Sequence, residues 1–260
     1  MQRKAPLRRP VFISHRGESA VAPENTLAAF RYAMEGDSDG METDVHLTSD
    51  GVVVCAHDSN LKRVFGEDVV IEEHTLAELR RLTALPHAEQ YPHETVPTLA
   101  EALLLLRPGK LFFIEVKGDD SRVADAMVEE VRKAGVASEQ IVVIAFSAEV
   151  IRHVHKTYPE YRTLWLMSFA RDAATGAFLH DTAYYLDILK DIGADGIDCH
   201  ANLDFVDKAF CRALHDAGME IAVWTVDDAA AGRQLMLADV DAITSNCALA
   251  LRKALLPARA

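Results

Sequence analysis

Short apolar runs alternate with amphipathic stretches along almost the whole chain. In residues 24–36, Leu27, Phe30, Ala33 and Met34 recur at the spacing that puts them on one face of a helix. Eight short runs rich in β-branched and aromatic residues each precede a helical stretch of this kind, which is typical of buried strands. We predict these strands at residues 11–17, 40–48, 110–117, 141–147, 161–168, 194–200, 220–227 and 241–247.

Eight strand–helix units in a chain of 260 residues match a single-domain (β/α)8 TIM barrel, an α/β fold. Residues 51–57 extend the second strand after a turn, and helices are expected at 75–82 and 98–106. An open, doubly wound sheet is the alternative, although no GxGxxG follows the first strand. We assign residues 11–257 to the barrel, with a basic N-terminal extension at 1–10 and a short insertion at about 59–97.

Composition narrows the possible partners. A formal net charge of -13 disfavours nucleic acids and anionic membranes as partners, so an anionic substrate would need local positive charge, which a metal ion can supply. The chain has no apolar run long enough for a membrane anchor or signal peptide, and we expect a cytoplasmic protein. Cys55 and Cys199 lie in apolar runs and are expected to be buried free thiols.

Ionisable side chains gather where the predicted strands end, which is where active sites of (β/α)8 barrels lie. Strand side chains alternate between two faces, so Glu42 and Asp44 share a face, as do Glu115 and Lys117. The residues at strand ends that carry candidate chemistry are His15, Arg16, Glu42, Asp44, His57, Asp58, Glu115, Lys117 and Trp224.

Glu42, Asp44 and Glu115 would repel one another if all three point inward, and a hard divalent cation such as Mg²⁺ or Ca²⁺ relieves that conflict. His15 and His57 flank this set and suit general acid–base catalysis near neutral pH. Fixed positive charge for a phosphate comes from Arg16 and Lys117. Trp224 is either a core residue or a ligand contact.

Other polar residues have weaker signals. His153 and His155 have a metal-like spacing, but they lie on a charged helix and we interpret them as solvent-facing. No role is assigned to Asp198, His200 or Asn246.

Several of these residues form motifs in an order that resembles the glycerophosphodiester phosphodiesterase family. The motifs are HRG at 15–17, PENT at 23–26, ExDV at 42–45, TxDG at 48–51, HD at 57–58, ExK at 115–117 and WTV at 224–226. The resemblance implies a TIM barrel that hydrolyses glycerophosphodiesters to sn-glycerol 3-phosphate and an alcohol, using a divalent metal.

Carried over by position, the resemblance gives Glu42, Asp44 and Glu115 to the metal and makes His15 and His57 the acid–base pair. Arg16 and Lys117 would hold the phosphate, and Trp224 would pack on the glycerol carbons. The resemblance leaves open direct attack by water or a route through a cyclic phosphate.

Two features bear on the details of the site. Glu24 and Asn25 are interpreted as capping the first helix or shaping the loop under the site. The family's last strand often has ITD followed within two residues by Pro, whereas residues 243–247 are ITSNC, so this side of the pocket differs. The short insertion favours small head-group diesters over long-chain lipids.

Alternative functions are a lysophospholipase D or a phosphoinositide-type phosphodiesterase on the same barrel, and a non-catalytic phosphodiester-binding barrel. A metal-dependent amidohydrolase fits less well, because it needs HxH at the end of the first strand, where this chain has HRG. The alcohol group, the metal and the choice between monomer and homodimer stay open.

Overall fold

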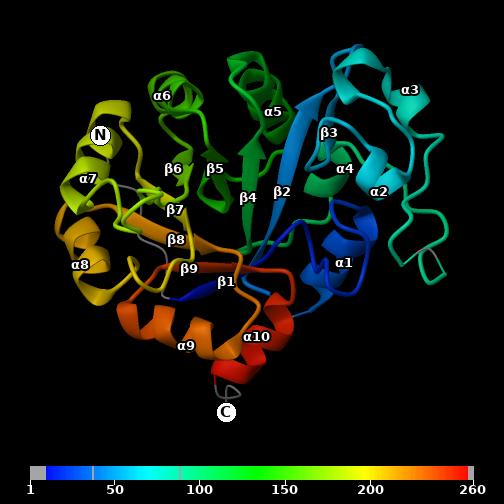
Figure 1. Ribbon diagram of the computed structural model, residues 1–260. Coiled ribbons are helices and arrows are strands. Elements are labelled where there is room, and N and C mark those ends of the chain that lie inside the picture. The colour runs from blue at the N-terminus through cyan, green and yellow to red at the C-terminus, as the bar shows by residue number, and fades with distance from the viewer. Residues whose placement is uncertain (1–9, 37, 88, 257–260) are drawn as a thin grey trace.

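The computed structural model, which describes residues 10–36, 38–87 and 89–256, contains a closed barrel of eight parallel strands surrounded by helices (Figure 1). The first strand, β1, pairs in parallel with both β2 and β9, so the sheet has no open edge between its two ends. The predicted TIM barrel is therefore confirmed, and the open sheet is wrong. The barrel strands are β1 (Val11–Ser14), β2 (Gly40–Leu47), β4 (Leu111–Val116), β5 (Ile141–Ala145), β6 (Arg162–Met167), β7 (Gly196–His200), β8 (Glu220–Trp224) and β9 (Ala242–Ser245).

A short ninth strand extends β2 beyond the barrel. β3 (Val53–Cys55) runs antiparallel to β2, with Val45 opposite Cys55. The backbone N–H of Ala56 donates to the carbonyl of Asp44 at 3.0 Å, so the chain is still tied to β2 one residue later. The hairpin therefore brings the chain back to the level of Asp44 on β2, where His57 and Asp58 follow. This agrees with the predicted extension of the second unit.

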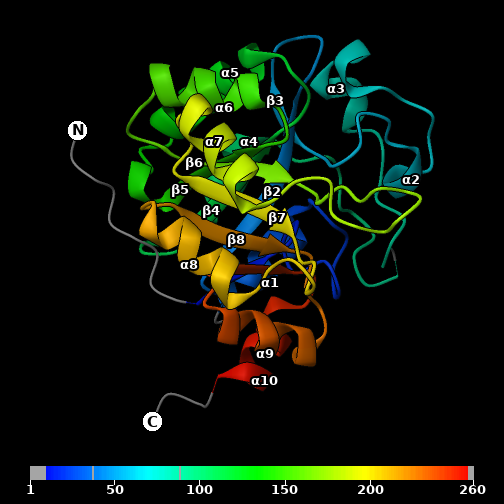
Figure 2. The same ribbon diagram turned by 60° about the vertical axis from the view of Figure 1, so that its left-hand side comes forward.

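Helices surround the barrel on its outer side (Figures 1 and 2). Among the described residues, none of them is long and apolar enough to cross a membrane. The helices of the repeating units are α1 (Leu27–Glu35), α4 (Leu99–Leu103), α5 (Ser121–Lys133), α6 (Ala148–Thr157), α7 (Thr182–Ile192), α8 (Lys208–Asp216), α9 (Ala229–Ala238) and α10 (Ala248–Leu255).

Between β3 and α4 the chain forms a small subdomain-like segment. This segment contains α2 (Lys62–Phe65), the 3₁₀ turn η1 (Ile71–Glu73) and α3 (Leu76–Leu79); a separate 3₁₀ turn, η2 (Ser138–Gln140), lies later in the chain before β5. Its buried apolar side chains form a cluster of their own beside the barrel, which includes Leu61, Val64, Phe65, Ile71 and Leu79. The predicted extension at 1–10 lies outside the described residues except for Pro10.

Several predicted helix ends are wrong. The helices expected at 75–82 and 98–106 are short, although each starts with a capping box, in which a Thr and the Glu three residues later bond each other's backbone N–H. α1 begins at Leu27 rather than at residue 24, because Asn25 has a left-handed φ of 53° and Thr26 is the N-cap.

The strands carry apolar side chains on both faces. Outward-facing residues such as Phe12 and Phe112 pack in the main core with the helices, and inward-facing residues such as Ile13, Phe113 and Val142 fill the barrel. Toward the carboxyl ends of the strands the inward positions become polar. The barrel interior is therefore an apolar plug beneath a polar site. Cys55, Cys199 and Cys211 are buried and free, as predicted for the first two.

Gly196 is where the barrel wall leaves no room for a side chain. An added Cβ would lie against the backbone carbonyl of Glu220 on the neighbouring strand, which cannot move aside. Gly196→Ala should therefore lower the free energy of unfolding by about 1–3 kcal/mol, the usual cost of overpacking. Gly232→Ala is the control, because the atoms nearest to its Cβ are side-chain methyl groups of Leu255 and Leu251, which can shift, and not backbone. Urea denaturation of both variants checks this, and equal stability for the two would contradict the packing.

Candidate active site

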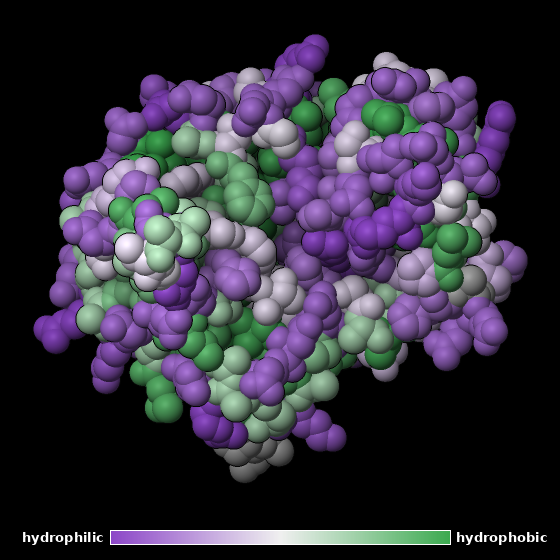
Figure 3. All heavy atoms as spheres, in the orientation of Figure 1, coloured by the Kyte–Doolittle hydropathy of each residue, from purple (hydrophilic) through white to green (hydrophobic). Residues whose placement is uncertain are grey.

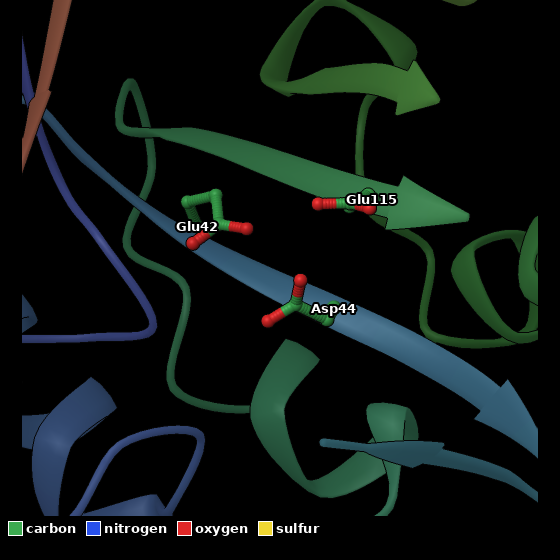
Figure 4. A group of neighbouring side chains, drawn as sticks. All are labelled: Glu42, Asp44 and Glu115. Carbon is green, nitrogen blue, oxygen red and sulfur yellow. The ribbon is translucent and has the colours of Figure 1, made fainter. Parts of the chain in front are cut away.

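The centre of the site is a group of three buried carboxylates on β2 and near the carboxyl end of β4. Glu42 and Asp44 share one face of β2, and Asp44 lies opposite Glu115 in the register of β4. One oxygen from each carboxylate lies within 4.8 Å of the others, and the side chains point toward one another (Figure 4). Each is less than 10% exposed. The predicted alternation of strand faces therefore does bring the three acids together.

Charge within this group is unevenly distributed. Burial and the neighbouring Asp44 charge raise the pKa of Glu42 well above its usual value, and they raise the pKa of Glu115 to about 7. Burial alone would also raise the pKa of Asp44, but Lys117 and Arg16 outweigh it and hold that pKa below its usual range. Without a cation, three like charges cannot all be ionised here.

Two basic side chains partly balance the carboxylates. The ammonium of Lys117 lies 2.9 Å from Asp44 Oδ1 and 2.8 Å from Glu115 Oε1. Arg16 contributes twice, since its Nε lies 3.5 Å from Asp44 and its backbone N–H donates to Glu42 at 2.7 Å. The site therefore combines three acids with two cations at the mouth of the barrel.

The HRG turn depends on its glycine. Arg16 and Gly17 both have left-handed φ values, 56° and 75°. A Cβ on Gly17 would come within 2.5 Å of the Ala29 backbone, so α1 packs directly on this turn. This tight turn points the Arg16 backbone N–H at Glu42.

His15 is oriented by Asn246, the residue directly after the last barrel strand, β9. Its Nδ1 lies 2.8 Å from the amide oxygen of Asn246, and the Asn246 amide nitrogen donates to Asp227 at 2.7 Å. That second bond fixes the amide so that its oxygen accepts from Nδ1, which leaves Nε2 unprotonated in the neutral ring. His15 Nε2 lies 4.0 Å from Glu42. Burial, helped by the Arg16 charge, lowers the pKa of His15 to about 4.

His57 has a charged partner instead. Its Nδ1 lies 2.7 Å from Asp58 Oδ1, and Arg63 Nε donates to the other Asp58 oxygen at 2.6 Å. Burial lowers the pKa of His57, and the Asp44 carboxylate opposes that shift. Sequence patterns did not point to Arg63 or Asp227. For Asn246 the one signal was the departure from ITD at residues 243–247, which did not reveal its role.

Trp224 sits on the far side of the barrel mouth, on β8. Its indole N–H donates to the carbonyl of Asp198 at 3.1 Å. The rings of Phe146 and His200 form T-shaped contacts with it, with ring centroids 5.8 and 5.6 Å from its own. The ring is partly exposed, so Trp224 is neither a fully buried core residue nor a free one. Below it, Asp198 is buried, which raises its pKa, and its Oδ1 has no hydrogen-bond partner among the described residues.

Asn25 acts on the site and not on a helix end. Its amide nitrogen donates to Asp44 at 2.8 Å, and its oxygen accepts from Thr43 at 2.7 Å. Of the two expected roles of Glu24 and Asn25, capping is wrong, because Thr26 caps α1, whereas shaping the loop under the site agrees with these contacts of Asn25. Asn25 instead orients a carboxylate of the central group.

The HxH pair on α6 lies outside the site. His153 is only half-exposed, since its Nε2 lies 2.6 Å from Asp125 on α5, and His155 is also partly buried. Both were expected to be solvent-facing, but each is only partly exposed. Neither histidine belongs to the carboxylate group that could hold a metal among the residues that the structure describes.

The sequence profile of the Glycerophosphoryl diester phosphodiesterase family matches residues 15–248. The chain belongs to this family. Glycerophosphodiester phosphodiesterase 1 of Bos taurus is 30% identical over 87% of this chain and 75% of its own length. The glycerophosphodiester phosphodiesterase of Caldanaerobacter subterraneus is 28% identical over 90% of this chain and 93% of its own. An Oleispira antarctica phosphodiesterase, solved in complex with the product sn-glycerol-3-phosphate, has a TM-score of 0.83 and 26% identity over 95% of this chain and 96% of its own.

Membership in the glycerophosphoryl diester phosphodiesterase family makes this chain an enzyme, a hydrolase of phosphodiesters, as the motifs predicted. The matched region spans the barrel from the HRG turn to the start of α10. Within it, Glu42, Asp44 and Glu115 offer an all-oxygen set of ligands, the chemistry that hard divalent cations prefer.

The raised pKa of Glu115 makes stability depend on pH in the metal-free protein. Its pKa is about 7 in the fold against an ordinary 4.5, so the folded protein keeps a proton there that the unfolded chain releases. The stabilisation is complete below pH 4.5 and is lost as the pH rises through 7. Glu115→Gln should remove this loss. Urea denaturation in EDTA from pH 5 to pH 8 should therefore favour the variant increasingly, and parallel profiles would contradict the shifted pKa.

Proposed function

We propose that this enzyme is a metal-dependent glycerophosphodiester phosphodiesterase that releases sn-glycerol 3-phosphate and an alcohol. The observation that carries the proposal is a single arrangement: three buried carboxylates within 4.8 Å, with two imidazoles beside them, each held through Nδ1. Support also comes from the Oleispira antarctica phosphodiesterase, whose bound product is sn-glycerol 3-phosphate.

Glu42, Asp44 and Glu115 would hold the divalent cation, Mg²⁺ or Ca²⁺. Such an ion supplies positive charge that stabilises a phosphoryl oxygen and lowers the pKa of a bound hydroxyl. The metal-free site has too little positive charge for its three carboxylates, which supports this. Burial and mutual repulsion raise the pKa values of Glu42 and Glu115. Arg16 and Lys117 add cationic groups that would bind the phosphate oxygens.

The two histidines are suited to different halves of the reaction. Asp58, a carboxylate, stabilises a protonated His57, whereas neutral Asn246 does little for a protonated His15. We assign His15 Nε2 as the base that takes the proton of the attacking oxygen. His57 then protonates the oxygen of the departing alcohol. A pair of groups with environments this unlike is the usual arrangement for acid and base.

Trp224 would pack against the carbon atoms of the glycerol group. Its partly exposed ring lies at the mouth of the barrel, and the bond from its indole N–H to the Asp198 carbonyl fixes the ring plane. Phe146 and His200 contact the ring in T-shaped arrangements, which restrict its orientation further.

A second substrate class, lysophospholipids, is favoured by one observation. A groove of about 680 Å³ lies between the loops that follow β6 and β7, where the apolar Phe178, Leu179 and Phe205 stand among polar residues that include Asp181, Asp204 and Asp207. Leu179 is 53% exposed, and Phe146 at the end of β5 is 51% exposed. In Figure 3 the hollow at the centre has a hydrophilic wall on the side of β2 and α2, with more hydrophobic atoms on the side of β5 to β7. An acyl chain would fit such a surface.

Metal removal tests the proposed reaction. The purified protein should release sn-glycerol 3-phosphate from glycerophosphocholine or glycerophosphoethanolamine, lose this activity in EDTA, and regain it with Mg²⁺, Ca²⁺ or Mn²⁺. Glu42→Gln should weaken metal binding in calorimetry, because it removes one ligand charge from the group. Glu72→Gln is the control, since Glu72 lies outside the group. Absence of turnover with every metal and diester would reject the proposal, and faster turnover of lysophosphatidylcholine would select the second class.

Leaving-group chemistry tests the assignment of the histidines. His57→Ala should lower kcat for glycerophosphocholine roughly 10²–10⁴-fold, the usual contribution of a general acid. With a p-nitrophenyl ester of glycerol 3-phosphate the loss should be much smaller, because p-nitrophenolate leaves without a proton. His15→Ala should lose a similar factor with both substrates. Equal losses for His57→Ala on the two substrates would contradict its role as the acid.

A further inference from the structure

Arg63 on α2 is not part of the group formed by Glu42, Asp44 and Glu115. It is bonded instead to two other carboxylates near that group, Glu24 and Asp58. Its two terminal nitrogens donate to both oxygens of Glu24, each at 2.7 Å, and its Nε donates to Asp58 at 2.6 Å. A planar guanidinium is the side chain that can hold one carboxylate with two parallel bonds and a second with its remaining N–H.

Each carboxylate that Arg63 holds contacts a residue of the proposed machinery. Glu24 accepts from Arg16 Nη1 at 2.8 Å, and Asp58 lies 2.7 Å from His57 Nδ1. A continuous chain of charged hydrogen bonds therefore runs from Arg16 through Glu24, Arg63 and Asp58 to His57. It links the HRG turn after β1 with the segment after β3, which the barrel strands do not connect directly.

The backbone of Arg63 is fixed independently of these bonds. The neighbouring residues Val64 and Phe65 are buried in the small core beside the barrel, with Leu61 and Ile71. The side chain of Asn60 accepts from the backbone N–H of Lys62 at 3.0 Å, and Gly66 ends α2 in a left-handed conformation. Packing of the inserted segment thus sets where the guanidinium lies.

We infer that Arg63 is a positioning residue for the reaction: it holds Asp58 so that His57 keeps its Nδ1 bond, and it holds Glu24 so that Arg16 faces the phosphate. The inference rests on the proposed function, in which His57 and Arg16 act on the substrate. Arg63 is 49% exposed, so its charge alone stabilises little. What it supplies is geometry, because a bidentate pair fixes direction as well as distance.

Three substitutions separate the two branches of this hydrogen-bond chain. The His57 branch runs from Arg63 through Asp58 to His57, and the Arg16 branch runs from Arg63 through Glu24 to Arg16. Asp58→Asn removes only the His57 branch and should lower kcat with little change in KM. Glu24→Gln weakens only the Arg16 branch and should raise KM. Arg63→Gln should do both, with kcat lower by roughly 10–100-fold, the usual cost of losing an outer hydrogen-bond partner. The control is Arg80→Gln, because Arg80 pairs with Glu101 and ties the same segment to α4 away from the site.

A double-mutant cycle distinguishes positioning from general loss of structure. Arg63→Gln in the His57→Ala background should lower kcat by less than about threefold, since residues that act as one unit are not additive. The activated p-nitrophenyl ester keeps this background measurable. An equal factor in both backgrounds would overturn the inference, as would a loss matched by Arg80→Gln.

A spectroscopic measurement needs no turnover. In protein with ¹⁵N-labelled histidine, the His57 Nδ1–H signal should lie at low field in the wild type. It should weaken or shift in Arg63→Gln, while the His15 signal stays in place. An unchanged His57 signal in Arg63→Gln would overturn the inference. Failure of the wild type to hydrolyse any glycerophosphodiester would reject the proposed function instead, and this spectrum would still report on Arg63.

Discussion

Mutual repulsion among Glu42, Asp44 and Glu115 is the constraint around which the rest of the site is arranged. Three carboxylates in one buried corner cannot all be ionised without compensation. The protein supplies part of that compensation from Lys117 and Arg16, and it supplies hydrogen bonds from Asn25 and the Arg16 backbone. The proposed divalent cation would supply the positive charge that is still missing. The apolar plug below keeps water from screening the charges, so the barrel interior and the polar mouth are parts of one electrostatic arrangement.

Around this centre the two histidines are oriented by different means. His15 is bonded to the neutral amide of Asn246, directly after the closing strand of the barrel, and His57 to the carboxylate of Asp58, directly before the inserted segment. Neutral and charged partners make two chemically identical imidazoles unequal. The inserted segment thus contacts the proposed machinery, because Asp58 is in turn bonded to Arg63 on α2.

Much of this was accessible from the sequence, and the reason is periodicity. Alternating apolar and polar positions determine both the strand count and the faces of Glu42, Asp44 and Glu115, so the barrel and the carboxylate group could be predicted. The start of α1 could not, because the left-handed Asn25 that precedes its cap is bonded to Asp44 and Thr43, which are distant in sequence. Arg63 and Asn246 were missed for the same reason. Arg63 bonds Glu24 at a separation of 39 residues and Asn246 bonds His15 at a separation of 231 residues, and no local pattern encodes such separations.

The separation between His15 and Asn246 has a consequence for biogenesis. One histidine of the proposed pair is near the start of the chain, and Asn246, which orients it, directly follows β9, the last strand to be synthesised. The backbone N–H of Leu249 likewise donates to Glu18. A nascent chain that lacks β9 leaves the imidazole without its acceptor, however well the other strands have formed. Contacts of such long sequence separation form late in folding. The competent arrangement therefore arises only when the ring of strands is complete, so the onset of catalysis reports closure of the whole barrel.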